Sequence, residues 1–211
     1  MQIEETGRFF PDDRKKIKAR ISRYERLLKS KNHRDGAGKR FLLGPLYLLM
    51  GDVEGAAKSY AWYRRKFPDD MPEAFNHLCW VVTLLRTDQI KTAKEKMREL
   101  IFSNLYIIPM LLKEPIKEYK FRHSSNWHEK TYVSEGPFRE IFALVGEAEL
   151  DWIREVWRSK AMQAAVDSYI EIQIKLTDLR PGPERTRLVE ESIRISTGKE
   201  FSFSKLKNIF C

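Results

Sequence analysis

Apolar residues in this chain recur every three or four positions, which is the spacing of one face of an α-helix. The first such run lies in residues 12–31, after Pro11 and two acidic residues that are typical of a helix start. A polar segment, 32–36, then interrupts the pattern. The sequence therefore predicts an N-terminal helix whose buried face consists of Ile17, Ile21, Tyr24 and Leu28.

Four more helical patterns follow in quick succession. They occupy residues 38–50, 53–66, 72–86 and 89–102, and short turn signals separate them. Helices joined by such tight turns pack as antiparallel pairs, and a succession of similar pairs is the signature of a repeat architecture.

The first pair carries a spaced set of small, aromatic and turn residues: Leu43, Gly44, Tyr47, Gly51, Ala56, Tyr60 and Pro68. The small residues Gly44 and Ala56 let two helices approach closely, the tyrosines fill the space beside them, and Pro68 ends the second helix. This set resembles the tetratricopeptide repeat. It departs from the repeat at Arg40, where tryptophan is preferred.

The second pair resembles the same repeat less closely, through Phe75, Leu78, Cys79, Ala93, Met97 and Leu100. The two pairs together cover about 65 of the 211 residues, and the chain is similar to uncharacterised bacterial tetratricopeptide-repeat proteins. The resemblance implies a right-handed stack of helix pairs with a concave face for a protein partner, and it implies no chemistry.

The rest of the chain predicts more helices around this core. Residues 104–112 are apolar enough to be buried, and Pro109 should kink or end a helix. We expect an all-α protein in four parts: a basic capping helix (1–36), tetratricopeptide-like repeats (37–118), an irregular loop (119–136) and a helical region that packs on the repeats (137–211). Within the last part, helices are expected at 137–145, 147–177 and 184–196, followed by an apolar tail that docks on the body.

Composition favours a soluble globular protein, with 42% hydrophobic and 33% charged residues. No apolar run reaches the roughly 18 residues of a membrane span, and residues 1–5 lack the features of a secretory leader, so a cytoplasmic location is expected. The two cysteines, Cys79 and Cys211, form neither a disulfide framework nor a metal-ligand pattern.

The net charge of +9 is concentrated in one segment. Residues 14–34 hold ten Lys or Arg and one acid, so the remainder holds 39 − 10 = 29 basic and 30 − 1 = 29 acidic residues. This segment is either a solvated helix face or a surface that binds nucleic acid or another polyanion. Charge density favours nucleic acid, whereas the scarcity of aromatic residues disfavours it. The candidate polyanion-binding residues are Lys15, Lys16, Lys18, Arg20 and Arg23.

The tetratricopeptide resemblance implies a partner-binding groove lined by Phe41, Pro45, Leu48, Asn76, Trp80 and Thr83. We therefore expect a non-catalytic adaptor that binds a peptide or protein, with Trp80 as an aromatic anchor. The alternative is that the C-terminal helices fill this groove and make the same residues part of the core, because more than 100 residues follow the repeats.

Catalysis is the weaker hypothesis. The chain has no phosphate-binding glycine loop, nucleophile elbow or HExxH motif, and no cofactor or metal is expected. An enzyme or metal site around His123, Trp127 and His128 stays open as an alternative, although the five-residue spacing of the histidines matches no established ligand motif. His77, among apolar helix positions, is interpreted as structural.

Overall fold

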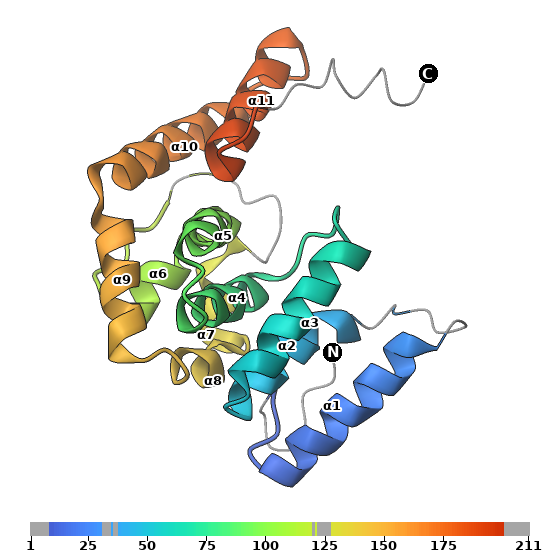
Figure 1. Ribbon diagram of the computed structural model, residues 1–211. Helices are drawn as coiled ribbons and strands as arrows, with labels where there is room; N and C mark the ends of the chain where they lie inside the picture. The colour runs from blue at the N-terminus through green and yellow to red at the C-terminus, as the bar shows by residue number, and fades with distance from the viewer. Residues whose placement is uncertain (1–8, 31–34, 36–37, 120, 122–127, 201–211) are drawn as a thin grey trace.

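The computed structural model describes residues 9–30, 35, 38–119, 121 and 128–200, and all regular secondary structure within these ranges is helical (Figure 1). This confirms the all-α prediction for the described part of the chain. None of the described helices is long and apolar enough to cross a membrane.

The first five helices match the predicted segments to within a few residues. They are α1 (Arg14–Lys29), α2 (Lys39–Leu49), α3 (Val53–Lys66), α4 (Ala74–Arg86) and α5 (Ile90–Ser103). Helix α2 packs against α1, α3 and α4, and α4 packs against α3 and α5. The chain between residues 39 and 103 therefore forms two neighbouring helix pairs.

The second half of the described chain contains α6 (Ile107–Leu111), α7 (Lys130–Glu135), α8 (Phe138–Phe142), α9 (Glu147–Arg158), α10 (Lys160–Asp178) and α11 (Pro183–Thr197). Two predictions were wrong here. The single helix expected over 147–177 is two helices, because Ser159 adopts an extended backbone and caps α10 by accepting a hydrogen bond from the Met162 amide. The loop expected over 119–136 contains α7, which is too short to show a periodic pattern.

The contact between α2 and α3 depends on Gly44, one of the small residues in the repeat-like set. A Cβ atom on Gly44 would lie 2.3 Å from Cζ of Tyr60, whose side chain is buried. The Tyr60 ring is held in place by stacking on Trp80, with 4.8 Å between ring centroids. Glycine at position 44 thus lets α2 approach an aromatic pair that links α3 to α4.

Arg40, where the repeat pattern prefers tryptophan, lies against two aromatic rings. Its guanidinium carbon lies 4.3 Å from the Phe41 ring centroid and 5.1 Å from that of Phe67. The same group forms ion pairs with Asp35 (3.1 Å) and Asp70 (2.6 Å). A planar cation between rings therefore ties the segments before α2 and after α3 together.

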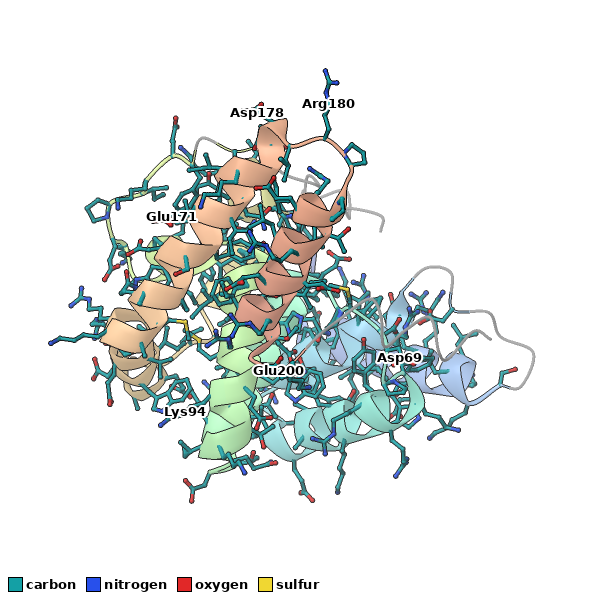
Figure 2. All side chains as sticks on the ribbon, turned by 90° about the horizontal axis from the view of Figure 1, so that it is seen from above. Asp69, Lys94, Glu171, Asp178, Arg180 and Glu200 are labelled. Carbon is teal, nitrogen blue, oxygen red and sulfur yellow. The ribbon has the colours of Figure 1, made fainter. Side chains whose placement is uncertain are left out.

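The C-terminal helices return to the helix pairs through polar contacts. Arg86, at the end of α4, forms a 2.6 Å ion pair with Glu149 of α9. Helices α10 and α11 pack side by side, and α11 lies against α5 (Figure 2). There Arg98 donates a 2.6 Å hydrogen bond to the carbonyl of Ile195. The predicted docking of the apolar tail falls in residues 201–211, outside the described part of the chain.

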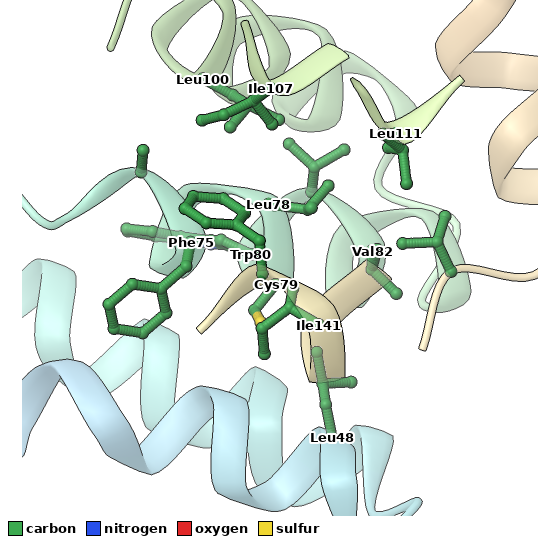
Figure 3. Close-up of a cluster of buried hydrophobic side chains, with 14 of the residues drawn as sticks. Leu48, Phe75, Leu78, Cys79, Trp80, Val82, Leu100, Ile107, Leu111 and Ile141 are labelled. Carbon is green, nitrogen blue, oxygen red and sulfur yellow. The ribbon is translucent and has the colours of Figure 1, made fainter. Parts of the chain in front are cut away.

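Helix α4 lies at the centre of the described structure. All of its residues from Ala74 to Leu84 are buried, and the helix contacts α2, α3, α5 and α8. Figure 3 shows its side chains in one cluster with Leu48 of α2, Ile107 and Leu111 of α6 and Ile141 of α8. The apolar segment after residue 102 is buried in this core, as predicted.

We expect Gly44→Ala to lower the free energy of unfolding by about 1–3 kcal/mol, because the added methyl overlaps a ring that cannot move away. The gain in helix propensity, about 1 kcal/mol, offsets only part of this. Urea denaturation followed by circular dichroism measures the change.

Gly182→Ala is the matched control, since a Cβ at Gly182 meets no heavy atom within 4 Å. We expect a change of at most about 1 kcal/mol for the control. Equal effects of the two substitutions would show that α2 and α3 have room to move apart.

Candidate functional site

Five of the six residues assigned to a partner groove are buried: Pro45, Leu48, Asn76, Trp80 and Thr83. The sixth, Phe41, is partly buried. The predicted groove residues are therefore mostly buried. The rings that cover Trp80 belong to α3, whereas the alternative assigned this cover to the C-terminal helices.

The contacts of the α4 residues explain this difference. Asn76 donates its side-chain amide to the carbonyl of Phe41, and Thr83 donates a 2.8 Å hydrogen bond to the carbonyl of Cys79. Trp80 is enclosed by the rings of Tyr60 and Tyr63 of α3. This face of α4 packs against α3, whereas the expectation placed it on a free surface.

A small cavity remains where α3 meets α4. Its volume is about 60 Å³, and its lining includes Trp80 and Thr83 of the predicted groove. Two alanines of α3, Ala57 and Ala61, leave this space open, and the exposed Arg64 lies at its edge. Liquid water takes up about 30 Å³ per molecule, so the cavity suits a group of a few heavy atoms.

A polar cluster lies beside this cavity, between α4 and α5. The Lys96 ammonium is 4.3 Å from the Trp80 ring centroid and 2.5 Å from Oε2 of Glu99. Nδ1 of His77 is 3.7 Å from the same carboxylate oxygen, which is beyond hydrogen-bond distance. Burial, with a smaller contribution from the Lys96 charge, lowers the pKa of His77 to about 3. A histidine with this pKa is a weak base, as expected for a structural residue.

The alternative enzyme site falls mostly outside the described residues, which include His128 but neither His123 nor Trp127. Within the described ranges, no group of three His, Cys, Asp or Glu side chains is arranged to hold a metal ion. Cys79 is buried, and burial raises the pKa of its thiol, which disfavours the reactive thiolate form.

The cations of α1 form the most distinctive exposed surface of the described chain. Helix α1 buries Ile17, Ile21 and Tyr24 against the body, as its apolar pattern predicted. Its exposed residues are seven cations and two small neutral residues: Arg14, Lys15, Lys16, Lys18, Ala19, Ser22, Arg23, Arg26 and Lys29.

Two arginines of α1 are engaged with the body of the protein. Arg14 donates a 3.1 Å hydrogen bond to the carbonyl of Met50, and the partly buried Arg20 donates to the carbonyl of Phe9 at 3.4 Å. Arg20, a predicted polyanion-binding residue, is therefore less available than the other four. Arg26 and Lys29 were not among the predicted residues but are exposed on the same helix, and their position on the polar side of the helical pattern could have identified them.

Two described acidic residues of this region, Asp13 and Glu25, are engaged in hydrogen bonds with other groups. Asp13 caps the helix and accepts hydrogen bonds from the Lys15 and Lys16 amides at 2.6 and 3.4 Å. Glu25 accepts a 2.6 Å hydrogen bond from the Tyr47 hydroxyl. Between described residues, the exposed lysines of α1, Arg23 and Arg26 form no ion pair with a carboxylate.

The first turn of α1 carries Arg14, Lys15 and Lys16 and has no acidic residue. The N-terminus of a helix is the positive end of its dipole, so each cation there is unfavourable by about 0.3–1 kcal/mol at low ionic strength. The charge of this first turn is the reverse of the one that stabilises a helix. It is, however, well suited to attracting an anionic partner.

No family model matches this chain, and no curated protein or solved structure matches it either.

The burial of His77 predicts a pH dependence of stability. Its pKa is about 3 in the folded protein and about 6.5 in the unfolded chain. Below pH 6.5 only the unfolded chain takes up this proton, so stability falls as the pH is lowered towards 3. Between pH 7 and 5 this group should cost about 2 kcal/mol of unfolding free energy.

Urea denaturation at the two pH values, in the wild type and in His77→Gln, tests this effect. The variant should lose about 2 kcal/mol less than the wild type between pH 7 and 5. Parallel losses in both proteins would mean that His77 takes up a proton in the folded state and is not held neutral.

Proposed function

We propose that this protein binds nucleic acid through the exposed cations of α1: Lys15, Lys16, Lys18, Arg23, Arg26 and Lys29. The observation that carries the proposal is the composition of the exposed surface of α1, where every residue is a cation or a small neutral residue. A polymer with a regular row of phosphates gains affinity from each cation that displaces a counterion.

Accessibility favours this function over binding in the predicted groove. The α1 cations are exposed, whereas Trp80 and Asn76 are 5% and 2% exposed and make contacts inside the protein. A partner that used the predicted groove would have to separate α3 from α4, but one that used α1 needs no rearrangement.

The same surface is poorly suited to a membrane. A helix that binds at the membrane interface needs bulky apolar side chains on its outer face. In α1 the large apolar residues Ile17, Ile21 and Tyr24 pack inside the protein, and the exposed neutral residues are Ala19 and Ser22. Binding to anionic lipid would therefore rest on charge alone.

A variant in which Lys15, Lys16, Lys18 and Arg23 are replaced by Gln tests the proposal. We expect the wild type to bind labelled DNA with a steep salt dependence. Each contact between a protein cation and a phosphate releases about 0.9 counterion from the DNA. The slope of log K against log salt should fall in magnitude by about 3–4 in the variant. Fluorescence anisotropy over a series of KCl concentrations measures it.

The matched control removes four exposed cations elsewhere, through Gln at Arg65, Lys66, Lys91 and Lys94. It lowers the net charge equally and should leave most of the slope intact. If the control loses as much affinity for DNA as the α1 variant, binding depends on the net charge of the protein and not on the position of the α1 cations. Stronger binding to phosphatidylserine vesicles than to DNA would contradict the proposal.

A second candidate function is the binding of a peptide or protein in the cavity between α3 and α4. The observation that favours it is the combination of an aromatic wall, two alanines and the exposed Arg64 around one cavity. The sequence resembles tetratricopeptide repeats, and the packing of α2 to α5 is compatible with such helix pairs. Helix pairs of this kind commonly bind extended peptides. Trp80 would then contact the partner through the edge that faces the cavity.

Ala61→Leu tests this second candidate, because the larger side chain occupies the cavity without truncating a core residue. A partner that the wild type retains from lysate at high salt should be lost by the variant. Ala161→Leu on the exposed side of α10 serves as control. Retention by both variants would show that the partner does not enter the cavity.

A further inference from the structure

The exposed cations of α1 lie on both flanks and in the centre of its outer face. At 100° per residue, the exposed residues from Lys15 onward cover an arc of about 160° around the helix axis. Ala19 and Ser22 lie near its middle together with two of the cations. The cations fall in three pairs along this arc: Lys18 and Lys29 on one flank, Lys15 and Arg26 in the centre, and Lys16 and Arg23 on the other flank.

From this arrangement, and resting on the proposed nucleic-acid function, we infer that α1 lies in the major groove of B-form duplex DNA. A helix with side chains is about 10–12 Å wide, and the major groove is about 12 Å wide. Cations on both flanks then meet phosphates of the two strands that border the groove. A flat polyanion surface would leave one of the flanks without a partner.

The position of α1 in the molecule allows this insertion. Helix α1 packs mainly against α2, and Figure 1 shows it at the outer edge of the described structure. With 16 residues it is about 24 Å long, or roughly two-thirds of one turn of DNA. Its buried residues point towards α2, so the exposed arc faces away from the body.

Two of the four residues on the central strip are small, which leaves room there for a base edge to approach the helix. Ala19 and Ser22 extend little beyond the backbone, and the Ser22 hydroxyl can donate to or accept from a base. Arg26, on the same central strip, has the geometry to donate two hydrogen bonds to a guanine. The exposed arc has no Asn or Gln to read adenine, so sequence preference should be modest and directed to guanine.

Single-stranded nucleic acid is a poor ligand for this surface. Proteins that bind single strands stack bases on exposed aromatic side chains. The aromatic residue of α1, Tyr24, is 8% exposed and packs in the core. Duplex RNA carries similar backbone charge, but its major groove is too deep and narrow for a helix to enter. Comparing duplex DNA, duplex RNA and single-stranded DNA therefore distinguishes insertion into the major groove from binding by charge alone.

The test compares the affinity of the full chain for duplex DNA, duplex RNA and single-stranded DNA of one sequence at one salt concentration. We expect duplex DNA to bind at least tenfold more tightly than either of the others. The double variant Ala19→Leu/Ser22→Leu leaves the net charge unchanged. It should lose the preference for duplex DNA, because the larger side chains keep the helix backbone away from the bases. Leu at Ala161 and Thr186, exposed on α10 and α11, is the matched control.

Equal affinity for the three nucleic acids would overturn groove insertion while leaving the proposed function intact. So would a Leu variant that keeps the preference for duplex DNA. Absence of salt-dependent binding to all three would overturn the proposed function as well. Circular dichroism of each variant confirms that α1 and the rest of the chain remain folded.

Discussion

The described structure depends on the burial of α4 around its whole circumference. A surface helix needs one apolar stripe, but α4 must meet a partner on every side. Helices α2 and α3 supply one part of this enclosure, α5 another, and α8 closes a further side. Helices α3 and α5 keep exposed polar residues on their outer faces, whereas α2 has none and packs against α1 as well.

This central burial explains what the sequence could and could not predict. The apolar spacing located the first five helices within a few residues, and the small size of Gly44 predicted a close approach of α2 and α3. The same spacing could not show which side of α4 faces a neighbour. Asn76, Trp80 and Thr83 share one stripe, but nothing in the local pattern distinguishes a stripe that packs on α3 from one that lines a groove. That distinction depends on residues far away in the chain.

The C-terminal half shows a second limit of local patterns. Residues 147–177 have one continuous helical periodicity, yet an extended backbone at Ser159 divides them into two helices. The break lets α9 stay next to α4 through Arg86 and Glu149, while α10 turns away to pair with α11. The break combines the local Ser159 cap with long-range contacts such as that of Arg86 with Glu149, and apolar periodicity reports neither.

The candidate nucleic-acid surface was more visible from the sequence, because exposed charge is a local property. Four of the five candidate residues, Lys15, Lys16, Lys18 and Arg23, are exposed as predicted. Arg20 was the exception, and the reason is again a distant contact, here with the carbonyl of Phe9. Charge patterning thus predicted where the surface lies, and the structure determines which of its members are free to bind.

The way in which cations are used elsewhere in the chain strengthens the case for α1. Arg40, Arg86 and Arg158 each form close contacts with a carboxylate that joins separate segments, so their charge stabilises the fold. In α1, by contrast, like charges three and four residues apart repel one another by about 0.2–0.5 kcal/mol per pair. The cations of the first turn also oppose the helix dipole. The Asp13 cap and the buried face of α1 offset this cost, but they do not account for the charges themselves. A row of phosphates would remove the repulsion upon binding, and the free helix therefore holds its cations in the arrangement that such a partner requires.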